Sequence, residues 1–158
     1  MTQATVRVVG LGPADRGLVT DDAWRLITSS PVVRLRTRRH PAASTLDAIA
    51  SYDEWYDTAD SFDELYRAIA DDLARLAAEA GEVVYAVPGS PVVAERTVVL
   101  LREDPAVVSG EVAVAVHPAL GRWGLGTSGL TVVAPALPSA SEVTGSTTLT
   151  APSALSYQ

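Results

Sequence analysis

The stretch VRVVGLGPADRGLVT, residues 6–20, decides the fold of this chain. It begins as a short apolar run, which is typical of a strand buried in a parallel sheet. The run breaks at Gly10 and Gly12, followed by Pro13, and glycine lets the backbone turn sharply and approach a ligand with no Cβ in the way. Because ligands of open α/β sheets bind just past the carboxyl ends of strands, this loop is the first predicted cofactor site.

A second loop of the same construction follows another apolar run, in VVYAVPGSP at residues 83–91. Pro88, Gly89 and Ser90 end that strand, and a helix is predicted to begin at Pro91, where a missing N–H group costs nothing. The free N–H groups of such a helix start could hold a pyrophosphate, a carboxylate or a ligand amide. The plainer interpretation of both loops is a tight turn that any α/β fold needs.

Composition restricts the chemistry. The chain has 158 residues, enough for one domain, and it contains no cysteine and no lysine. Thiol nucleophiles, zinc–thiolate sites, Walker-type phosphate loops and Schiff bases are therefore excluded, and no metal site is predicted. A net charge of −7 argues against nucleic-acid binding. With no secretory signal and no membrane-spanning run, the expected location is the cytoplasm, and no membrane partner is expected.

Strand and helix patterns alternate over the first 118 residues. The predicted strands are 6–10, 31–35, 83–87 and 112–116, and the predicted helices are 21–28, 44–50, 62–80 and 91–102. The helix 62–80 is the best defined, with Ser61 and Glu64 expected to form a capping box and Gly81 to end it. The alternation predicts an α/β fold whose mainly parallel sheet has helices on both faces. Residues 119–158, rich in Gly, Ser, Thr and Pro, are expected to form a poorly structured tail.

Arginines follow the second predicted strand. Arg34, Arg36 and Arg38 alternate, so in an extended segment they would share one face near the carboxyl edge of the sheet. We hypothesise that Arg36 and Arg38 bind a small anionic substrate, since guanidinium pairs well with carboxylates and phosphates. The alternative is a solvated edge or a contact with a partner chain. A dinucleotide-binding Rossmann unit is disfavoured, because it needs an acidic residue where these arginines stand.

With both loops placed, the chain resembles the tetrapyrrole (corrin/porphyrin) methylase family. It is most similar to the methylase-like N-terminal domain of MazG-type nucleotide pyrophosphohydrolases. The resemblance covers about residues 6–120 and is carried by residues 8–20 (VVGLGPADRGLVT), 35–41 (LRTRRHP), 61–66 (SFDELY) and 83–98 (VVYAVPGSPVVAERTV).

The resemblance implies an N-terminal lobe that binds S-adenosylmethionine against a second lobe, and transfer of its methyl group to a tetrapyrrole-like acceptor. Gly12 and Pro13 would line the cofactor, while Gly89 and Ser90 would contact its methionine portion. In such enzymes the protein chiefly aligns donor and acceptor, so no catalytic residue is predicted. The predicted cofactor-binding set is Gly10, Gly12, Pro13, Pro88, Gly89 and Ser90.

The chain also departs from the family pattern. Ala14 and Arg16 replace a Gly and a Pro of the first loop, Ser90 replaces an Asp of many active methylases, and the second lobe is missing after about residue 120. These departures predict a truncated and inactive methyltransferase-like domain. The alternative is a non-catalytic regulatory or ligand-binding lobe associated with a MazG-type nucleoside triphosphate pyrophosphohydrolase. The family resemblance also implies a homodimer.

Overall fold

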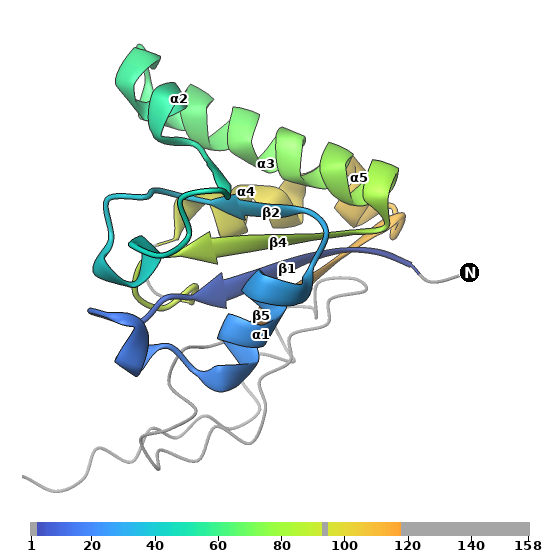
Figure 1. Ribbon diagram of the computed structural model, residues 1–158. Helices are drawn as coiled ribbons and strands as arrows, with labels where there is room; N and C mark the ends of the chain where they lie inside the picture. The colour runs from blue at the N-terminus through green and yellow to red at the C-terminus, as the bar shows by residue number, and fades with distance from the viewer. Residues whose placement is uncertain (1–2, 93–94, 118–158) are drawn as a thin grey trace, which may run out of the picture.

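A computed structural model describes residues 3–92 and 95–117 of the chain, and within them five strands form one parallel sheet (Figure 1). The strands are β1 Ala4–Gly10, β2 Val33–Leu35, β3 Ala50–Ser51, β4 Glu82–Val87 and β5 Val112–His117. Their order across the sheet is β3-β2-β4-β1-β5. Because all pairs are parallel, the carboxyl ends of the strands share one edge of the sheet. The predicted α/β fold is confirmed.

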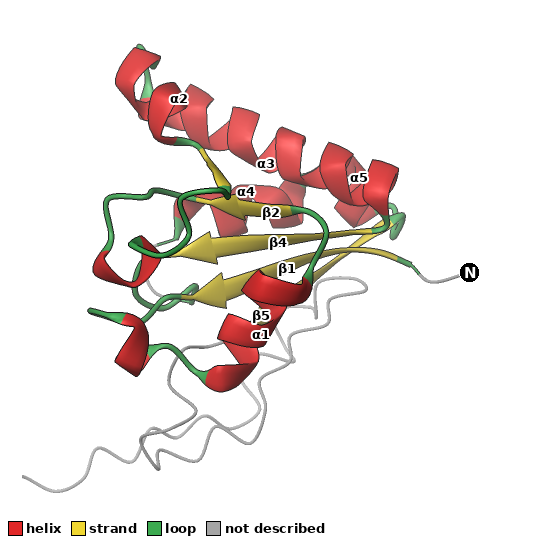
Figure 2. Cartoon of the chain, in the orientation of Figure 1, coloured by secondary structure: helices red, strands yellow, loops and turns green. Residues whose placement is uncertain are grey.

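Helices cover both faces of the sheet (Figure 2). The helices are α1 Asp21–Ser29, α2 Asp53–Thr58, α3 Phe62–Ala80, α4 Arg96–Glu103 and α5 Pro105–Val108, with 3-10 turns η1 Arg16–Leu18 and η2 Pro41–Ala43. The helix α1 lies on one face, and α3 and α4 lie on the other.

Strand β1 supplies both halves of the core. Val6 and Val8 face α3 and α4, whereas Val9 packs with Ile27 of α1 on the opposite face, and all three valines are fully buried. Alternate residues of a strand point to opposite faces, so a central strand covered on both sides is apolar on both, and the half-buried Arg7 of β1 is paired with Glu82. This is why the run at residues 6–10 is a reliable strand pattern.

The long helix α3 begins and ends at the predicted residues, but its capping box is not formed. Gly81, at φ 84°, ends the helix and donates its N–H to the Ala77 carbonyl at 2.8 Å. The Ser61 side chain makes no capping hydrogen bond. Asp63 and Glu64 lie in the exposed first turn, where their charges favour the positive end of the helix dipole.

Two other predicted helices are wrong in part. Residues 44–50 form turns and the start of β3, because a 3-10 turn opens earlier, where the His40 Nδ1 accepts the Ala42 N–H at 3.2 Å. The next residues, for which the sequence predicts no helix or strand, contain α2. The helix expected from Pro91 begins only at Arg96, with Glu95 as its N-cap. The predicted tail at 119–158 lies outside the described residues.

Candidate functional site

The two predicted loops lie side by side at the carboxyl edge of the sheet. Their strands β1 and β4 are neighbours, with Gly10 opposite Val87. Beyond the strands, the Gly12 N–H donates to the Gly89 carbonyl at 3.1 Å, and the Gly89 N–H donates to the Gly12 carbonyl at 2.9 Å. This pair of hydrogen bonds, the glycine bridge, joins the first loop to the second.

The two bridge glycines are needed for different reasons. Both have a positive φ, 70° at Gly12 and 67° at Gly89, which side-chain-bearing residues rarely adopt. A Cβ on Gly12 would lie 2.7 Å from the Leu18 carbonyl oxygen, so Gly12 allows the η1 turn to fold back over the loop. Among the described residues, a Cβ on Gly89 would meet nothing within 4 Å. In this part of the chain the space beside Gly89 is therefore open to a ligand.

The remaining loop residues differ in exposure. Pro13 is exposed, Pro88 and Ser90 are half-buried, and Gly10 is a buried residue of β1. After Pro13 the chain enters η1, which is capped by the Asp15 carboxylate. The predicted cofactor-binding residues thus lie together at the carboxyl ends of β1 and β4, where the glycine bridge joins the two loops; this place is called the niche below.

Buried polar atoms without a hydrogen-bond partner mark the same edge. Within the described residues these atoms are the Tyr85 hydroxyl, the Ser90 Oγ, the Glu95 Oε1, the Thr97 Oγ1 and the His117 Nε2. All five residues belong to the second half of β4, its connection to α4, the start of α4 or the end of β5. Since buried polar groups normally have partners, Tyr85, Glu95 and Thr97 on the α4 side of the sheet form a cluster that can receive further polar groups, whereas His117 lies on the α1 face.

Arg36 is held from three sides on the β2 side of the second loop. Its backbone N–H donates to the Ala86 carbonyl at 2.9 Å, its Nε to the Tyr56 hydroxyl at 2.9 Å and its Nη1 to the Glu95 Oε2 at 2.9 Å. The Glu95 side chain is 3% exposed and that of Arg36 is 27% exposed. Burial alone would lower the pKa of Arg36, but Glu95 and Tyr56 outweigh it and raise that pKa.

The other arginines do not form one free basic face with Arg36. The Arg38 guanidinium binds the Ile49 carbonyl through Nε at 3.1 Å and Nη2 at 2.6 Å. Arg39 pairs with Asp57 at 2.9 Å, and the Arg34 Nη1 donates to the Val33 carbonyl at 3.1 Å. The extended alternation expected from the sequence does not continue to Arg38, because β2 ends at Leu35 and the Arg38 guanidinium turns to Ile49.

Asp53 organises the turn that carries these arginines. Its carboxylate accepts the Arg38 backbone N–H at 2.8 Å, the Thr37 hydroxyl at 2.5 Å and the Ser51 hydroxyl at 2.9 Å. Burial acts to raise the pKa of Asp53, but these hydrogen bonds outweigh burial and lower it. The turn is thus fixed by an ionised carboxylate that holds β3 to the end of β2.

His117 ends β5 on the α1 face of the sheet, opposite Val9 of β1. Burial and the nearby Arg7 lower the pKa of its imidazole, although Asp22 and Glu82 act in the opposite direction. The ring is therefore kept neutral near pH 7, but it lies on the face away from Glu95.

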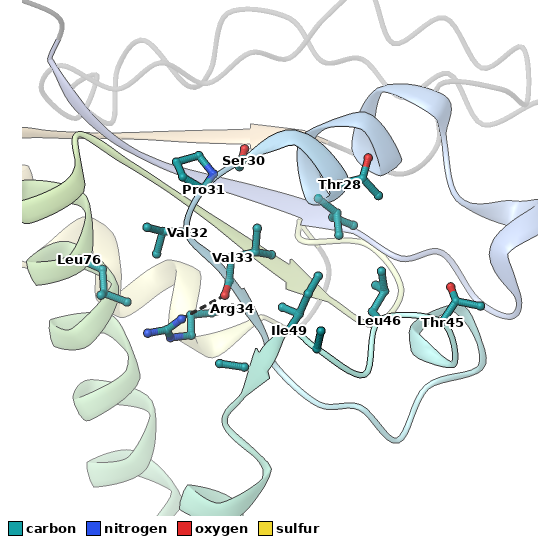
Figure 3. Close-up of a pocket in the computed structure, with 13 residues that line it drawn as sticks. Thr28, Ser30, Pro31, Val32, Val33, Arg34, Thr45, Leu46, Ile49 and Leu76 are labelled. Atoms are coloured by element: carbon teal, nitrogen blue, oxygen red, sulfur yellow. Dashed lines mark hydrogen bonds between the residues drawn. The ribbon is translucent and has the colours of Figure 1, made fainter.

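A separate cavity of about 650 Å³ opens at the β2–β3 edge (Figure 3). Its lining is mainly apolar and includes Val33, Leu46, Ile49 and Leu76 as well as Arg34. None of the glycine-loop residues lines it. This cavity is therefore not part of the niche at the glycine bridge.

The sequence does not predict the buried polar cluster of Tyr85, Glu95 and Thr97 that lies on the α4 side of the sheet. A tyrosine in an apolar strand predicts core, and a Glu near a helix start predicts a solvated face. Their burial depends on packing between β4, β2 and α4, which no local pattern encodes.

Within residues 3–92 and 95–117, no three His, Cys, Asp or Glu side chains come together as candidate metal ligands. No helix of the described part has the length and apolar character needed to cross a bilayer.

Comparison with known proteins gives a family match. The family model described as Tetrapyrrole (Corrin/Porphyrin) Methylases matches residues 5–130, which extends the expected match beyond residue 120. "Uncharacterized protein YabN" of Bacillus subtilis (strain 168) is 40% identical over 114 residues. That alignment covers 70% of this chain but 23% of the relative, so the chain spans less than a quarter of its length.

Two solved structures of uroporphyrin-III C-methyltransferase from Thermus thermophilus are also similar. The first is 27% identical, with a TM-score of 0.47, and the match covers 72% of this chain and 48% of that one. The second is 26% identical, with a TM-score of 0.48, covering 65% of this chain and 44% of that one.

Proposed function

The chain belongs to the tetrapyrrole (corrin/porphyrin) methylase family, and we propose that it binds S-adenosylmethionine at the glycine bridge. The observation that carries the proposal is the joining of the two loops by reciprocal Gly12–Gly89 hydrogen bonds, with open space beside Gly89. Family members are expected to hold the cofactor with these two loops, and the buried, unpartnered Ser90 Oγ lies beside them.

The residues present fit such a cofactor. Gly89 offers a surface without Cβ, Pro13 forms the exposed rim of the first loop, and the Ser90 hydroxyl would bind the methionine portion. When bound, the cofactor supplies an already activated sulfonium methyl group. The residues of this chain therefore need only to orient the two reactants and exclude water, which agrees with the absence of a predicted nucleophile.

We propose Arg36 as the group that binds an anionic part of a tetrapyrrole-like methyl acceptor. Its guanidinium is partly exposed, and Glu95 and Tyr56 already fix its direction. Its Nη2 makes no hydrogen bond to the described residues, so N–H donors remain for a carboxylate. Arg38 has a smaller part in this proposal, because the Ile49 carbonyl occupies two of its donors.

Calorimetric titration with S-adenosylmethionine tests the cofactor site. Ser90→Ala should weaken binding about tenfold and leave the melting temperature within about 2 °C of wild type, because the lost hydroxyl has no partner within the described chain. Ser29→Ala, at the exposed end of α1 next to Ser30, which contacts Glu82 at the amino end of β4, is the control and should bind like wild type. No heat with the folded wild-type chain would refute the proposal.

The second candidate is a non-catalytic ligand-binding lobe that regulates a MazG-type nucleoside triphosphate pyrophosphohydrolase. It is favoured by the small share of the relative that this chain spans, which leaves room there for another activity. Methyl-labelled S-adenosylmethionine separates the two candidates. Binding without transfer to any tetrapyrrole acceptor favours the regulatory lobe, and labelled product favours the methyltransferase.

We also propose that the chain forms the homodimer that the family resemblance implies. Val99 of α4 and Val108 of α5 are 46% and 68% exposed, and both lie on the helices that cover the same face of the sheet. Light scattering over a concentration series tests it: a constant monomer mass would exclude the dimer.

A further inference from the structure

Glu95 occupies a position that neither helix capping nor solvation explains. It is the N-cap of α4, yet its side chain makes no capping hydrogen bond, and glutamate is not among the favoured N-cap residues. Its carboxylate is almost fully buried, and a buried charge is costly unless it is paired. The carboxylate is therefore directed to another task.

That task is a link across the carboxyl edge of the sheet. The Glu95 Oε2 accepts from the Arg36 Nη1, and Arg36 is itself tied to β4 through Ala86 and to α2 through Tyr56. Glu95 stands five residues after Ser90, so it fixes the far end of the connection that starts with the second loop. The near end is fixed by the glycine bridge.

The polar cluster around this pair is not arranged for greatest stability. Within the described residues the Glu95 Oε1 is buried without a partner, and the neighbouring Tyr85 and Thr97 hydroxyls, which lie close to each other, make no well-formed hydrogen bond. Burial raises the pKa of the Tyr85 hydroxyl well above its usual value, and Glu95 adds to this effect. If the Arg36–Glu95 pair served only folding, these atoms would be expected to have hydrogen-bond partners. Buried polar groups that lack some of their hydrogen bonds stabilise a fold less than an apolar core does.

We propose that Glu95 is a positioning residue: through its ion pair with Arg36 it sets the geometry of the second loop and so holds the glycine bridge in register. Positioning of the bridge by Glu95 does not depend on the proposed function, but its effect on cofactor binding does. The pair also couples that site to Arg36, so cofactor affinity and the direction of the anion-binding guanidinium depend on the same contact.

Hydrogen exchange of the full chain tests the link without any ligand. In Glu95→Gln, the Gly12 and Gly89 amides should exchange at least about tenfold faster, while the Val84 amide, bonded to the Val32 carbonyl in mid-sheet, should keep its rate. The matched control is Glu82→Gln. It breaks the Arg7–Glu82 pair, which joins the same two strands at their amino ends, and should leave both bridge amides unchanged. Unchanged bridge amides in Glu95→Gln, or equal acceleration at Val84, would overturn the proposal.

A paired apolar replacement separates positioning from stability. Replacing both members of a buried ion pair with apolar residues of similar volume is often neutral for folding. Arg36→Met combined with Glu95→Leu should therefore keep the melting temperature, yet weaken S-adenosylmethionine binding about tenfold and accelerate bridge exchange. Wild-type affinity and wild-type exchange in this variant would refute the positioning role. If the wild-type chain binds no S-adenosylmethionine, the cofactor proposal fails, and the exchange experiment still decides the role of Glu95.

Discussion

Substituting alanine at each bridge glycine separates a folding requirement from a ligand requirement. Gly12, Gly89 and Gly81 have φ angles of 70°, 67° and 84°, so alanine meets a similar backbone penalty at all three. The surroundings differ. At Gly12 the new Cβ lies 2.7 Å from the Leu18 carbonyl oxygen, whereas at Gly89 and Gly81 it meets nothing within 4 Å among the residues that the structure describes. Gly81→Ala, at the end of α3, is the matched control for backbone strain.

The expected magnitudes follow from these two terms. A left-handed conformation costs a side-chain-bearing residue about 1–2 kcal/mol, which applies to all three variants. Forcing a methyl group against packed backbone adds about 1–3 kcal/mol at Gly12 alone. The free energy of unfolding should therefore fall by about 2–5 kcal/mol in Gly12→Ala. At about 2–4 °C per kcal/mol for a chain of this size, the melting temperature should fall by roughly 4–20 °C in Gly12→Ala and roughly 2–8 °C in the other two variants.

Thermal unfolding by circular dichroism measures the stability term, and calorimetry measures ligand affinity. Gly89→Ala should melt like Gly81→Ala but bind S-adenosylmethionine about tenfold more weakly, because its methyl group fills the open side of the niche. If Gly12→Ala melts like Gly81→Ala, the steric reasoning at Leu18 is wrong. If Gly89→Ala keeps wild-type affinity, the space beside Gly89 is not the cofactor site.

Two further predictions concern buried polar groups. Tyr85→Phe should not lower the free energy of unfolding, because the buried Tyr85 hydroxyl makes no well-formed hydrogen bond within the described residues, although Thr97 is near enough to act on its pKa; a loss of stability in urea titration would show that this hydroxyl has a partner. For His117, burial and Arg7 lower the pKa below 6.5, against the influence of Asp22 and Glu82. The unfolded state then binds the proton more readily, so stability should fall as the pH drops from about 7.5 to about 5.5. His117→Gln should flatten that slope, and an unchanged slope would contradict the lowered pKa.

Buried strands were the most predictable part of this fold. The runs at residues 6–10, 83–87 and 112–116 match β1, β4 and β5 to within two residues at each end, because a strand covered on both faces is mostly apolar; Arg7 is the charged exception and pairs with Glu82. The helix α3 was equally clear, since its buried stripe repeats every three to four residues.

The failures occur where tertiary contacts override local pattern. Leu46 and Ile49 have helical spacing, but they reach the α1-side core from turns. The two-residue strand β3 exists because it pairs with β2, and residues 50–51 alone give no strand pattern. At α4, the preference of Pro91 for a first helical position is overridden, and Glu95, bound to Arg36, stands at the N-cap. The two loops of the site were predictable because each is a local motif, whereas the cluster at Tyr85, Glu95 and Thr97 comes together only on folding.

The strand order also governs how the chain acquires its structure as it is synthesised. Of the five described strands, β1 is synthesised first. Its two neighbours in the sheet start only at Glu82 (β4) and Val112 (β5), so neither edge of β1 can pair until much more of the chain has been made. Such non-local pairing slows folding and leaves an apolar strand unpaired in the meantime. The β1–β4 ladder can close once α3 and β4 have emerged, whereas β5 can dock only as the last strand of the sheet. Nascent chains that stall between residues 90 and 110 should therefore be the form most dependent on chaperones.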